Sequence, residues 1–518
     1  MISMTATDVA VTDVHIAIIG AGFSGLGAAI KLTQNGFTDY LVIDRGADFG
    51  GTWRDNTYPG AACDVPSNLY SYSFALNPKW SRTYSHQAEI HRYINDVATR
   101  HDIASHTRFR TEVLDARWDE ERKSWLIDVE TDGVASQVRA RLLVGAVGPL
   151  CEPNLPDIDG IDGFEGKIVH SARWDHDYDY AGKRIAVIGT GASAIQIVPQ
   201  VAKIAGHLDV YQRTAPWIVP RTERPYTAVE HAAFRFLPGF QKLSRGAIYT
   251  GAEAVAFGMT YAPAALKPVE ALCKANIARG TADRALRRAV TPDYRVGCKR
   301  ILKSNDWYPA LDRDNVDLVT DPIASISPRG IVTADGIERD VDVIVVATGF
   351  HVTDSPVFSH IVGADGRSLA QVWESAGMQG YKGSTVHGFP NMMLMVGPST
   401  GLGHTSMVYM IESQLNYLVG FAKTVRAQSI TRIDVKAEAQ AEFNESLQRT
   451  LARSVWATGG CASWYKDANG NITTLWPGFT FAFRRITRNF DVAAYDISRA
   501  LPGTKHTDDA PVAEPATV

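Results

Sequence analysis

Two copies of one strand–turn–helix–strand pattern constrain the fold of this 518-residue chain more than any other feature. The first copy spans residues 15–44 and the second spans residues 184–213. The turn positions are Gly20, Gly22 and Gly25 in the first copy and Gly189, Gly191 and Ala194 in the second. Small residues at these places allow a tight turn, the close approach of a pyrophosphate and close packing of the following helix, whose free N–H groups face the phosphates. We therefore expect an α/β chain with two Rossmann-like dinucleotide-binding domains.

The residue that ends the second strand differs in charge between the two copies. Asp44 and Arg213 stand at the same distance after Gly22 and Gly191. An acid at this place accepts hydrogen bonds from the hydroxyls of an adenosine ribose, whereas an arginine suits a 2′-phosphate. The chain is therefore expected to bind one dinucleotide with a free ribose and one that resembles NADP.

Length and strand pattern indicate how the two units are arranged. A chain of 518 residues is too long for one core. Buried-strand patterns at 141–148 and 341–349 close the first and second units, and an Ala-rich helical pattern lies between the halves of the second. We expect the second unit to be inserted into the first. The expected divisions are a first domain at 10–150 and 351–503, a second at 151–225 and 295–350, a helical insertion at 226–294 and a disordered tail at 504–518.

Composition excludes several classes of partner. The net charge of −4 argues against nucleic acid and anionic membranes. No apolar run approaches the roughly 20 residues that span a bilayer, and the first residues lack a signal-peptide pattern, so we expect a cytoplasmic protein. The five cysteines are far apart, without a CxxC pair or metal-ligand spacing: Cys63, Cys151, Cys273, Cys298 and Cys461. We expect them to be free thiols and expect no metal site.

The connector between the two units carries a more specific motif. Phe164, Gly166, His170, Trp174 and Asp175 match the FxGxxxHxxxW(P/D) pattern, so the chain resembles the Baeyer–Villiger monooxygenases. The related N-hydroxylating and flavin-containing monooxygenases usually have a shorter motif that lacks the tryptophan. Further stretches similar to the family are residues 50–53, 58–60, 71–74, 297–300, 347–350, 463–465 and 476–478.

The resemblance implies both cofactors and reaction. FAD would bind the first unit and NADPH the second, and O₂ would react to give a C4a-peroxyflavin. Its anion would attack a small-molecule ketone, and rearrangement would insert oxygen beside the carbonyl to give an ester or lactone. Such an anion needs a dry site and a fixed cation.

The resemblance also assigns residues. Arg300 matches the catalytic arginine of the family, and Asp64 matches the carboxylate that pairs with it. Arg213 and Lys299 would hold the 2′-phosphate. The expected cofactor-binding residues are Gly20, Gly22, Phe23, Gly25, Asp44, Thr52, Trp53, Asp64, Tyr70, Val113, Thr190, Gly191, Ala192, Ser193, Ala194, Arg213, Thr214, Lys299, Arg300 and Trp464. Trp464 is either a lid over the nicotinamide or an ordinary core tryptophan, and His170 is expected to couple the connector to NADP binding.

Three other functions are compatible with two dinucleotide units. An N- or S-oxygenating flavin monooxygenase would act on amines or sulfides in place of ketones. A disulfide reductase needs a redox cysteine pair close in sequence, which this chain lacks. An FAD-bound redox sensor would show no substrate-stimulated NADPH turnover. The natural ketone and the oligomeric state do not follow from the sequence.

Overall fold

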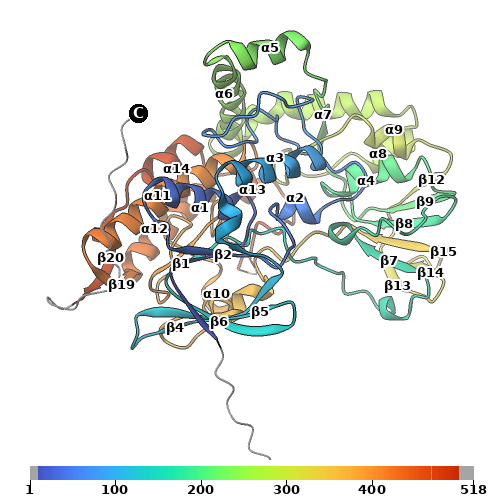
Figure 1. Cartoon of the computed structure of the whole chain (residues 1–518). Helices are drawn as coiled ribbons and strands as arrows, with labels where there is room; N and C mark the ends of the chain where they lie inside the picture. The colour runs from blue at the N-terminus through green and yellow to red at the C-terminus, as the bar shows by residue number, and fades with distance from the viewer. Residues whose placement is uncertain (1–9, 468, 501–518) are drawn as a thin grey trace, which may run out of the picture.

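The computed structural model describes residues 10–467 and 469–500, whose two main sheets, one mixed and one parallel, have helices packed around them (Figure 1). The tail predicted to be disordered, 504–518, lies outside the described residues, as do the last three residues of the predicted first domain. None of the described helices is both long and apolar enough to cross a bilayer.

The first sheet is built from both ends of the chain. Its order is β17-β4-β5-β6-β1-β2-β3, and β18 also pairs with β6. The strands are β1 (Val11–Ile19), β2 (Tyr40–Ile43), β3 (Thr107–Arg108), β4 (Thr111–Asp119), β5 (Ser124–Thr131), β6 (Val134–Gly145), β17 (Ile361–Val362) and β18 (Met392–Leu394). Around β1 the strands are parallel, whereas β4, β5 and β6 form an antiparallel meander. Because β18 joins β6, residues beyond 350 complete the sheet that the N-terminal residues begin.

The second sheet is wholly parallel, with the order β12-β9-β8-β16-β7. Its strands are β7 (Lys167–His170), β8 (Arg184–Ile188), β9 (His207–Tyr211), β12 (Val316–Val319) and β16 (Val343–Val346). Apolar side chains on both faces are buried, as expected for a parallel sheet covered on both sides. Together with the first sheet, it confirms the predicted α/β fold with two Rossmann-like units.

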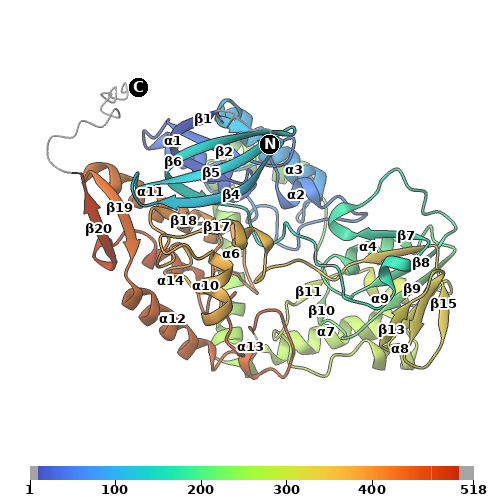
Figure 2. The ribbon, with the colours of Figure 1, turned by 90° about the horizontal axis from the view of Figure 1, so that it is seen from below.

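Helices pack around both main sheets, as the two views in Figure 1 and Figure 2 show. Those of the first unit are α1 (Phe23–Gln34), α2 (Thr52–Asp55), α3 (Gln87–Arg100), α10 (Leu369–Ala376), α11 (Met407–Ala427), α12 (Ala437–Leu451), α13 (Val455–Thr458) and α14 (Thr480–Ile486). Those of the second unit are α4 (Ala194–Val201) and α9 (Trp307–Leu311). Smaller strands are β10 (Ile218–Val219), β11 (Leu302–Lys303), β13 (Ile323–Ile326), β14 (Gly330–Thr333), β15 (Glu338–Asp340), β19 (Ile430–Val435) and β20 (Tyr495–Arg499).

The segment predicted to be a helical insertion is helical. It contains α5 (Ala228–Phe236), α6 (Phe240–Thr260), α7 (Lys267–Gly280) and α8 (Arg284–Ala289), and α5 and α6 project at the top of Figure 1. Thr227 and Glu230 form a capping box that starts α5. Pro268 lies in the first turn of α7, where the missing N–H breaks no helical hydrogen bond.

Candidate active site

One cavity of about 1630 Å³ connects the two dinucleotide units. A pocket for a single small molecule typically measures about 300–1,000 Å³, so this cavity has room for two large ligands and a substrate. All the predicted site residues line it except Gly25 and Ala194, which lie beneath the two turns. The cavity opens at the carboxyl ends of β1 and β8, the position where parallel α/β sheets bind ligands.

The two glycine turns have the same local geometry. Gly20 has φ +107° and Gly189 has φ +114°, a backbone region that residues with a side chain rarely adopt. A Cβ on Gly20 would lie 2.5 Å from the carbonyl oxygen of Ala146, and one on Gly189 would lie 2.6 Å from that of Ala347. A Cβ on Gly25 would lie only 1.8 Å from the carbonyl oxygen of Gly20. Glycine at these three positions is therefore required by close packing, as predicted.

Both helices that follow the turns begin without a partner for their first N–H groups. Gly22 precedes α1 and Ser193 precedes α4; neither helix has a side-chain cap or an acidic residue in its first turn. The open N–H groups and the positive end of the helix dipole favour an anion. Since the cavity reaches both helix starts, the residues present fit two pyrophosphates.

Asp44 is buried at the end of β2 and already accepts three hydrogen bonds. Its donors are the backbone N–H of Ala21 at 2.6 Å, that of Gly46 at 2.7 Å and the Arg54 guanidinium at 2.7 Å. A carboxylate offers about four acceptor sites, so one site is left for a ribose hydroxyl. The bonds to Ala21 and Gly46 hold the carboxylate beside the glycine turn.

Aromatic side chains stand beside the first turn. The indole N–H of Trp53 donates to the Tyr70 hydroxyl at 3.0 Å, and the Tyr70 ring packs edge-on against Phe23 at 5.3 Å. Burial raises the pKa of Tyr70 well above its usual range, so the phenol stays protonated. Thr52 on α2 and Val113 on β4 line the same part of the cavity.

Two cations without an ion-pair partner lie beside the second turn. In the part of the chain that the structure describes, no carboxylate makes an ion pair with Arg213 or Lys299. Burial, and then the charge of Arg213, lower the pKa of Lys299. The Thr190 hydroxyl donates to the carbonyl of Thr214 at 2.9 Å and fixes the turn to the arginine segment. This cluster of like charges fits an anionic group.

Arg300 and Asp64 form a two-bonded ion pair inside the cavity. The Nε and Nη2 of Arg300 donate to the two Asp64 carboxylate oxygens at 2.8 Å each. Burial raises the pKa of Asp64, but the charges of Arg300 and Lys303 and the hydrogen bonds from Arg300 together outweigh burial and leave the pKa below its usual value. The Asp64 charge in turn raises the pKa of Arg300, although burial lowers it. Both groups are charged at neutral pH, and about a third of the Arg300 side chain (38%) remains exposed to the cavity.

Trp464 projects from a C-terminal loop at the rim of the cavity. Its exposed fraction is 55%, which excludes the alternative of an ordinary core tryptophan. The neighbouring Tyr465 is buried, and its ring packs on Trp464 at 4.6 Å. Burial raises the pKa of the Tyr465 phenol, whereas the positive charge of Arg300 lowers it.

The connector motif holds the second sheet in place. His170 ends β7; its Nδ1 accepts from the N–H of Ala172 at 3.1 Å and its Nε2 donates to the carbonyl of Gly349 at 3.1 Å. Burial lowers the pKa of His170, so the ring is neutral with both nitrogens occupied. Trp174 stacks on Tyr180 at 4.8 Å. His170 is thus a fixed link between the connector and the end of β16.

A polar contact that the sequence did not indicate joins the two units. Gln196 on α4 accepts from the Tyr58 hydroxyl at 3.1 Å and from the Ala62 N–H at 3.3 Å, and its amide donates to the Ala62 carbonyl at 2.9 Å. A Cβ on Gly60 would lie 2.7 Å from the Gln196 carbonyl oxygen. A single glutamine on a helix carries no pattern that could have identified it. The sequence feature closest to this contact was the similarity of residues 58–60 to the family, because Tyr58 and Gly60 lie against Gln196.

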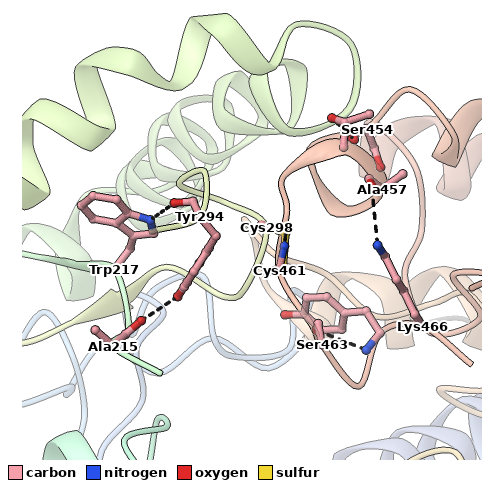
Figure 3. Close-up of a disulfide and its surroundings, with 11 residues drawn as sticks. Ala215, Trp217, Tyr294, Cys298, Ser454, Ala457, Cys461, Ser463 and Lys466 are labelled. Atoms are coloured by element: carbon pink, nitrogen blue, oxygen red, sulfur yellow. Dashed lines mark hydrogen bonds between the residues drawn. A yellow bond between two sulfur atoms is a disulfide. The ribbon is translucent and has the colours of Figure 1, made fainter. Parts of the chain in front are cut away.

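The expectation that all five cysteines are free thiols is wrong. Cys298 and Cys461 form a disulfide, with Cα atoms 6.1 Å apart and a sequence separation of 163 (Figure 3). Cys63, Cys151 and Cys273 are free. Spacing along the chain could not show the pair, because the fold brings together the segment before β11 and a C-terminal loop.

Comparison with known proteins finds relatives along almost the whole chain. A family model described as flavin-binding monooxygenase-like matches residues 13–237. A Baeyer–Villiger monooxygenase of Streptomyces coelicolor is 48% identical over 94% of this chain and 93% of its own. The structure of cyclohexanone monooxygenase from Rhodococcus sp. Phi1 bound to NADP⁺ matches with a TM-score of 0.82 and 28% identity, over 94% of this chain and 100% of that chain. OTEMO in complex with FAD and NADP matches with a TM-score of 0.83 and 27% identity, over 94% and 99%.

Two Rossmann-like units around one cavity, with an acid at one ribose position and cations at the other, define a flavin monooxygenase that uses a nicotinamide dinucleotide. The match to the Streptomyces enzyme, which extends over almost the whole of both chains, identifies the family within this class of flavin monooxygenases. The chain belongs to the Baeyer–Villiger monooxygenases, FAD-containing enzymes that use NADPH and O₂ to insert an oxygen atom next to a carbonyl.

Proposed function

We propose that this enzyme converts a small-molecule ketone into an ester or lactone, with FAD on the first unit, NADPH on the second and the ketone beside Arg300. The observation that supports this most directly is the Arg300–Asp64 ion pair, which lies in the same cavity as both glycine turns. The domain division that goes with it is residues 10–150 and 351–503 for FAD, 151–225 and 295–350 for NADPH, and 226–294 for the helical insertion.

The residues that would hold FAD surround the first turn. The N–H groups at the start of α1 would bind its pyrophosphate, and the free acceptor site of Asp44 would bind its ribose. Trp53 and Tyr70 would contact the flavin ring, with Phe23 packed behind Tyr70. Bound FAD would accept a hydride from NADPH and activate O₂, which is chemistry that no side chain supplies.

NADPH would occupy the second turn. The start of α4 would bind its pyrophosphate, and Arg213 with Lys299 would bind the 2′-phosphate. Arg213 and Lys299 repel each other, and a bound 2′-phosphate would offset this repulsion. This effect would add to the preference for NADPH over NADH, which lacks the phosphate. Trp464 would cover the nicotinamide from its exposed position at the cavity rim.

Arg300 would supply the fixed positive charge that the reaction needs. Its Nη1 donates to the Leu402 carbonyl at 3.4 Å, and its Nε and Nη2 donate to Asp64. The pairing fixes the guanidinium plane before the ketone binds, so little reorganisation is needed when negative charge develops on the carbonyl oxygen. Asp64 would act by holding and orienting Arg300.

The substrate would be a largely apolar ketone. Beyond Arg300 the cavity wall is formed by aliphatic and thioether side chains from the C-terminal half of the chain: Val396, Leu402, Met407, Ile411 and Leu475. Such a wall binds hydrocarbon by burial of apolar surface and helps to keep water from the reacting groups. The shape of this wall is set partly by the loop 397–403.

Product analysis tests the proposal. The purified protein, NADPH and O₂ are incubated with cyclic, linear and aryl ketones, and products are identified by mass spectrometry, with sulfides and amines as parallel substrates. We expect esters or lactones from at least one ketone class. Sulfoxides or N-oxides without any ester would favour the heteroatom oxygenase instead. The cytoplasmic location stays a prediction, which fractionation of the producing cells would check.

A further inference from the structure

The Cys298–Cys461 disulfide joins the two segments that bring Arg300 and Trp464 to the cavity. Cys298 lies two residues before Arg300, and Cys461 lies three residues before Trp464. Figure 3 shows the bond between the chain segment that contains Tyr294 and the loop that contains Ser463 and Lys466. Neither cysteine lines the cavity, although residues on both sides of the bond do.

The segment before Arg300 is well anchored without the disulfide. The Tyr294 carbonyl accepts from the indole N–H of Trp217 at 2.8 Å, and the Tyr294 hydroxyl donates to the Ala215 carbonyl at 3.0 Å. Arg300 itself is held by Asp64. This segment is therefore the fixed side of the bond.

The loop on the other side is anchored more weakly. We call residues 461–466 the rim loop. Its four residues 462–465 line the cavity. Within the loop the Lys466 N–H donates to the Ser463 carbonyl at 3.1 Å and the Tyr465 N–H donates to Ser463 Oγ at 3.3 Å, while Lys466 Nζ reaches the Ala457 carbonyl outside the loop at 3.5 Å. At its far end the Thr473 N–H donates to the Tyr465 carbonyl at 3.3 Å. The disulfide is the covalent anchor at its near end.

The packing around the bond is tight. Cys298 is fully buried and Cys461 is 9% exposed. A Cβ on Gly459 would lie 2.8 Å from the Cys298 sulfur, and the Gly459 carbonyl accepts from the Arg295 N–H at 3.0 Å. The bond thus fixes the start of the rim loop against the segment that leads to Arg300.

We propose that the Cys298–Cys461 disulfide is a positioning element of the oxygenation reaction, which holds Trp464 and Tyr465 of the rim loop in register with Arg300. The inference rests on the proposed role of this cavity in NADPH binding and ketone oxidation. A rim loop released at one end would spend less time closed over the nicotinamide. If the closed fraction fell to about one-tenth, the apparent dissociation constant of NADPH would rise about tenfold.

Loss of the disulfide would also uncouple NADPH consumption from ester formation. Water would enter a site that is not closed by the rim loop. The O₂ that is reduced with electrons from NADPH would then be released as hydrogen peroxide and would not oxidise the ketone. FAD binding should be unchanged, since the residues proposed to hold FAD surround the first glycine turn and lie outside the rim loop. A general loss of folding would instead reduce FAD content along with activity.

The presence of the disulfide is tested by counting free thiols in holoenzyme that has not been reduced beforehand. After denaturation without reductant, alkylation should label Cys63, Cys151 and Cys273, and after reduction all five cysteines. Labelling of all five without reductant would overturn the proposal.

The double variant C298S/C461S then tests the role. We expect full FAD content, an NADPH dissociation constant about tenfold higher, a smaller yield of ester per NADPH with matching peroxide, and faster hydrogen exchange in peptides that cover 461–466. C273S, which removes a buried free thiol from the same apolar cluster, is the matched control and should behave like the parent. Equal changes in C273S and the double variant, or parental values in the double variant, would overturn the proposal.

Reversal by a dithiol provides a second measurement. One thiolate of the dithiol attacks a cysteine sulfur and forms a mixed disulfide as the Cys298–Cys461 bond breaks. The second sulfur of the dithiol then displaces this cysteine and closes a cyclic disulfide. The two protons of the dithiol end on the two cysteine thiols. The reduced parent should match the double variant, and reoxidation should restore it. If the parent forms no ester from any ketone, the proposed function fails, whereas NADPH binding and hydrogen exchange still decide the role of the disulfide.

Discussion

The guanidinium of Arg300 donates two hydrogen bonds of 2.8 Å to the carboxylate of Asp64, although 236 residues separate them in sequence. Asp64 follows α2 of the first unit, and Arg300 precedes β11 beside the second. The pair can therefore form only when the two dinucleotide units are docked. A contact that crosses the cavity in this way links the arrangement of the domains to the charge at the proposed reaction centre.

Replacement of Asp64 by Asn should slow ester formation without loss of FAD. The amide keeps the shape but removes the negative charge, and a hydrogen bond to a charged group is worth about 1.5–3 kcal/mol, so kcat/KM should fall roughly 10- to 100-fold. Because the pKa of Asp64 lies below its usual value and that of Arg300 above its own, both stay charged between about pH 5 and 9. The ratio of parent to variant rates should therefore be constant across that range; a ratio that varies with pH would contradict the fixed ion pair.

Gln196→Ala should loosen the contact between the units. The change removes three neutral hydrogen bonds to Tyr58 and Ala62, each worth about 0.5–1.5 kcal/mol. We expect kcat to fall about tenfold while FAD content and the dissociation constant of NADPH change less than threefold by titration. Lys203→Ala, an exposed position just beyond α4, is the control and should match the parent. A large loss of FAD in Gln196→Ala would show instead that the glutamine stabilises the first unit alone.

Short-range patterns in the sequence predicted the frame of the site well. The buried-strand patterns at 141–148 and 341–349 correspond to the end of β6, which runs to Gly145, and to β16 (Val343–Val346). Gly20 and Gly189 were identified because a tight turn leaves room for glycine only. The sequence also identified Arg300 and Asp64 as a pair, by their similarity to family motifs, and the structure brings them together.

Contacts between distant segments were not predictable in the same way. Gln196 is one polar residue on a buried helix, and nothing local shows that it faces Ala62 of the other unit. Cys298 and Cys461 are separated by 163 residues, so their spacing carries no information about distance. The meander of β4 and β5 also went unpredicted, since its pairing is set by the rest of the sheet.

Arg213→Ala should weaken NADPH binding while it leaves NADH binding nearly unchanged. Neither this guanidinium nor the neighbouring Lys299 has an ion-pair partner among the described residues, and loss of one charge-assisted contact of about 1.5–3 kcal/mol should raise the NADPH dissociation constant roughly ten- to a hundredfold. Arg184→Ala, at the start of β8 and paired with Asp342, is the control. Fluorescence titration with both nucleotides checks this; equal losses for NADPH and NADH would exclude a phosphate contact.

Arg300→Ala should retain FAD but make no detectable ester. The substitution removes the only guanidinium that Asp64 pairs with in the described structure, and loss of one such electrostatic donor typically costs about 10²–10³ in rate. Reduction by NADPH should survive in part, since hydride transfer depends mainly on geometry. Arg300→Lys keeps the charge but loses the two-bonded contact, so its rate should lie between those of the parent and Arg300→Ala. Anaerobic stopped-flow reduction and product analysis after oxygen mixing separate the two steps. Ester formation at the parental rate in Arg300→Ala would show that another group supplies the cation, and the role of Asp64 as its partner would fall with it.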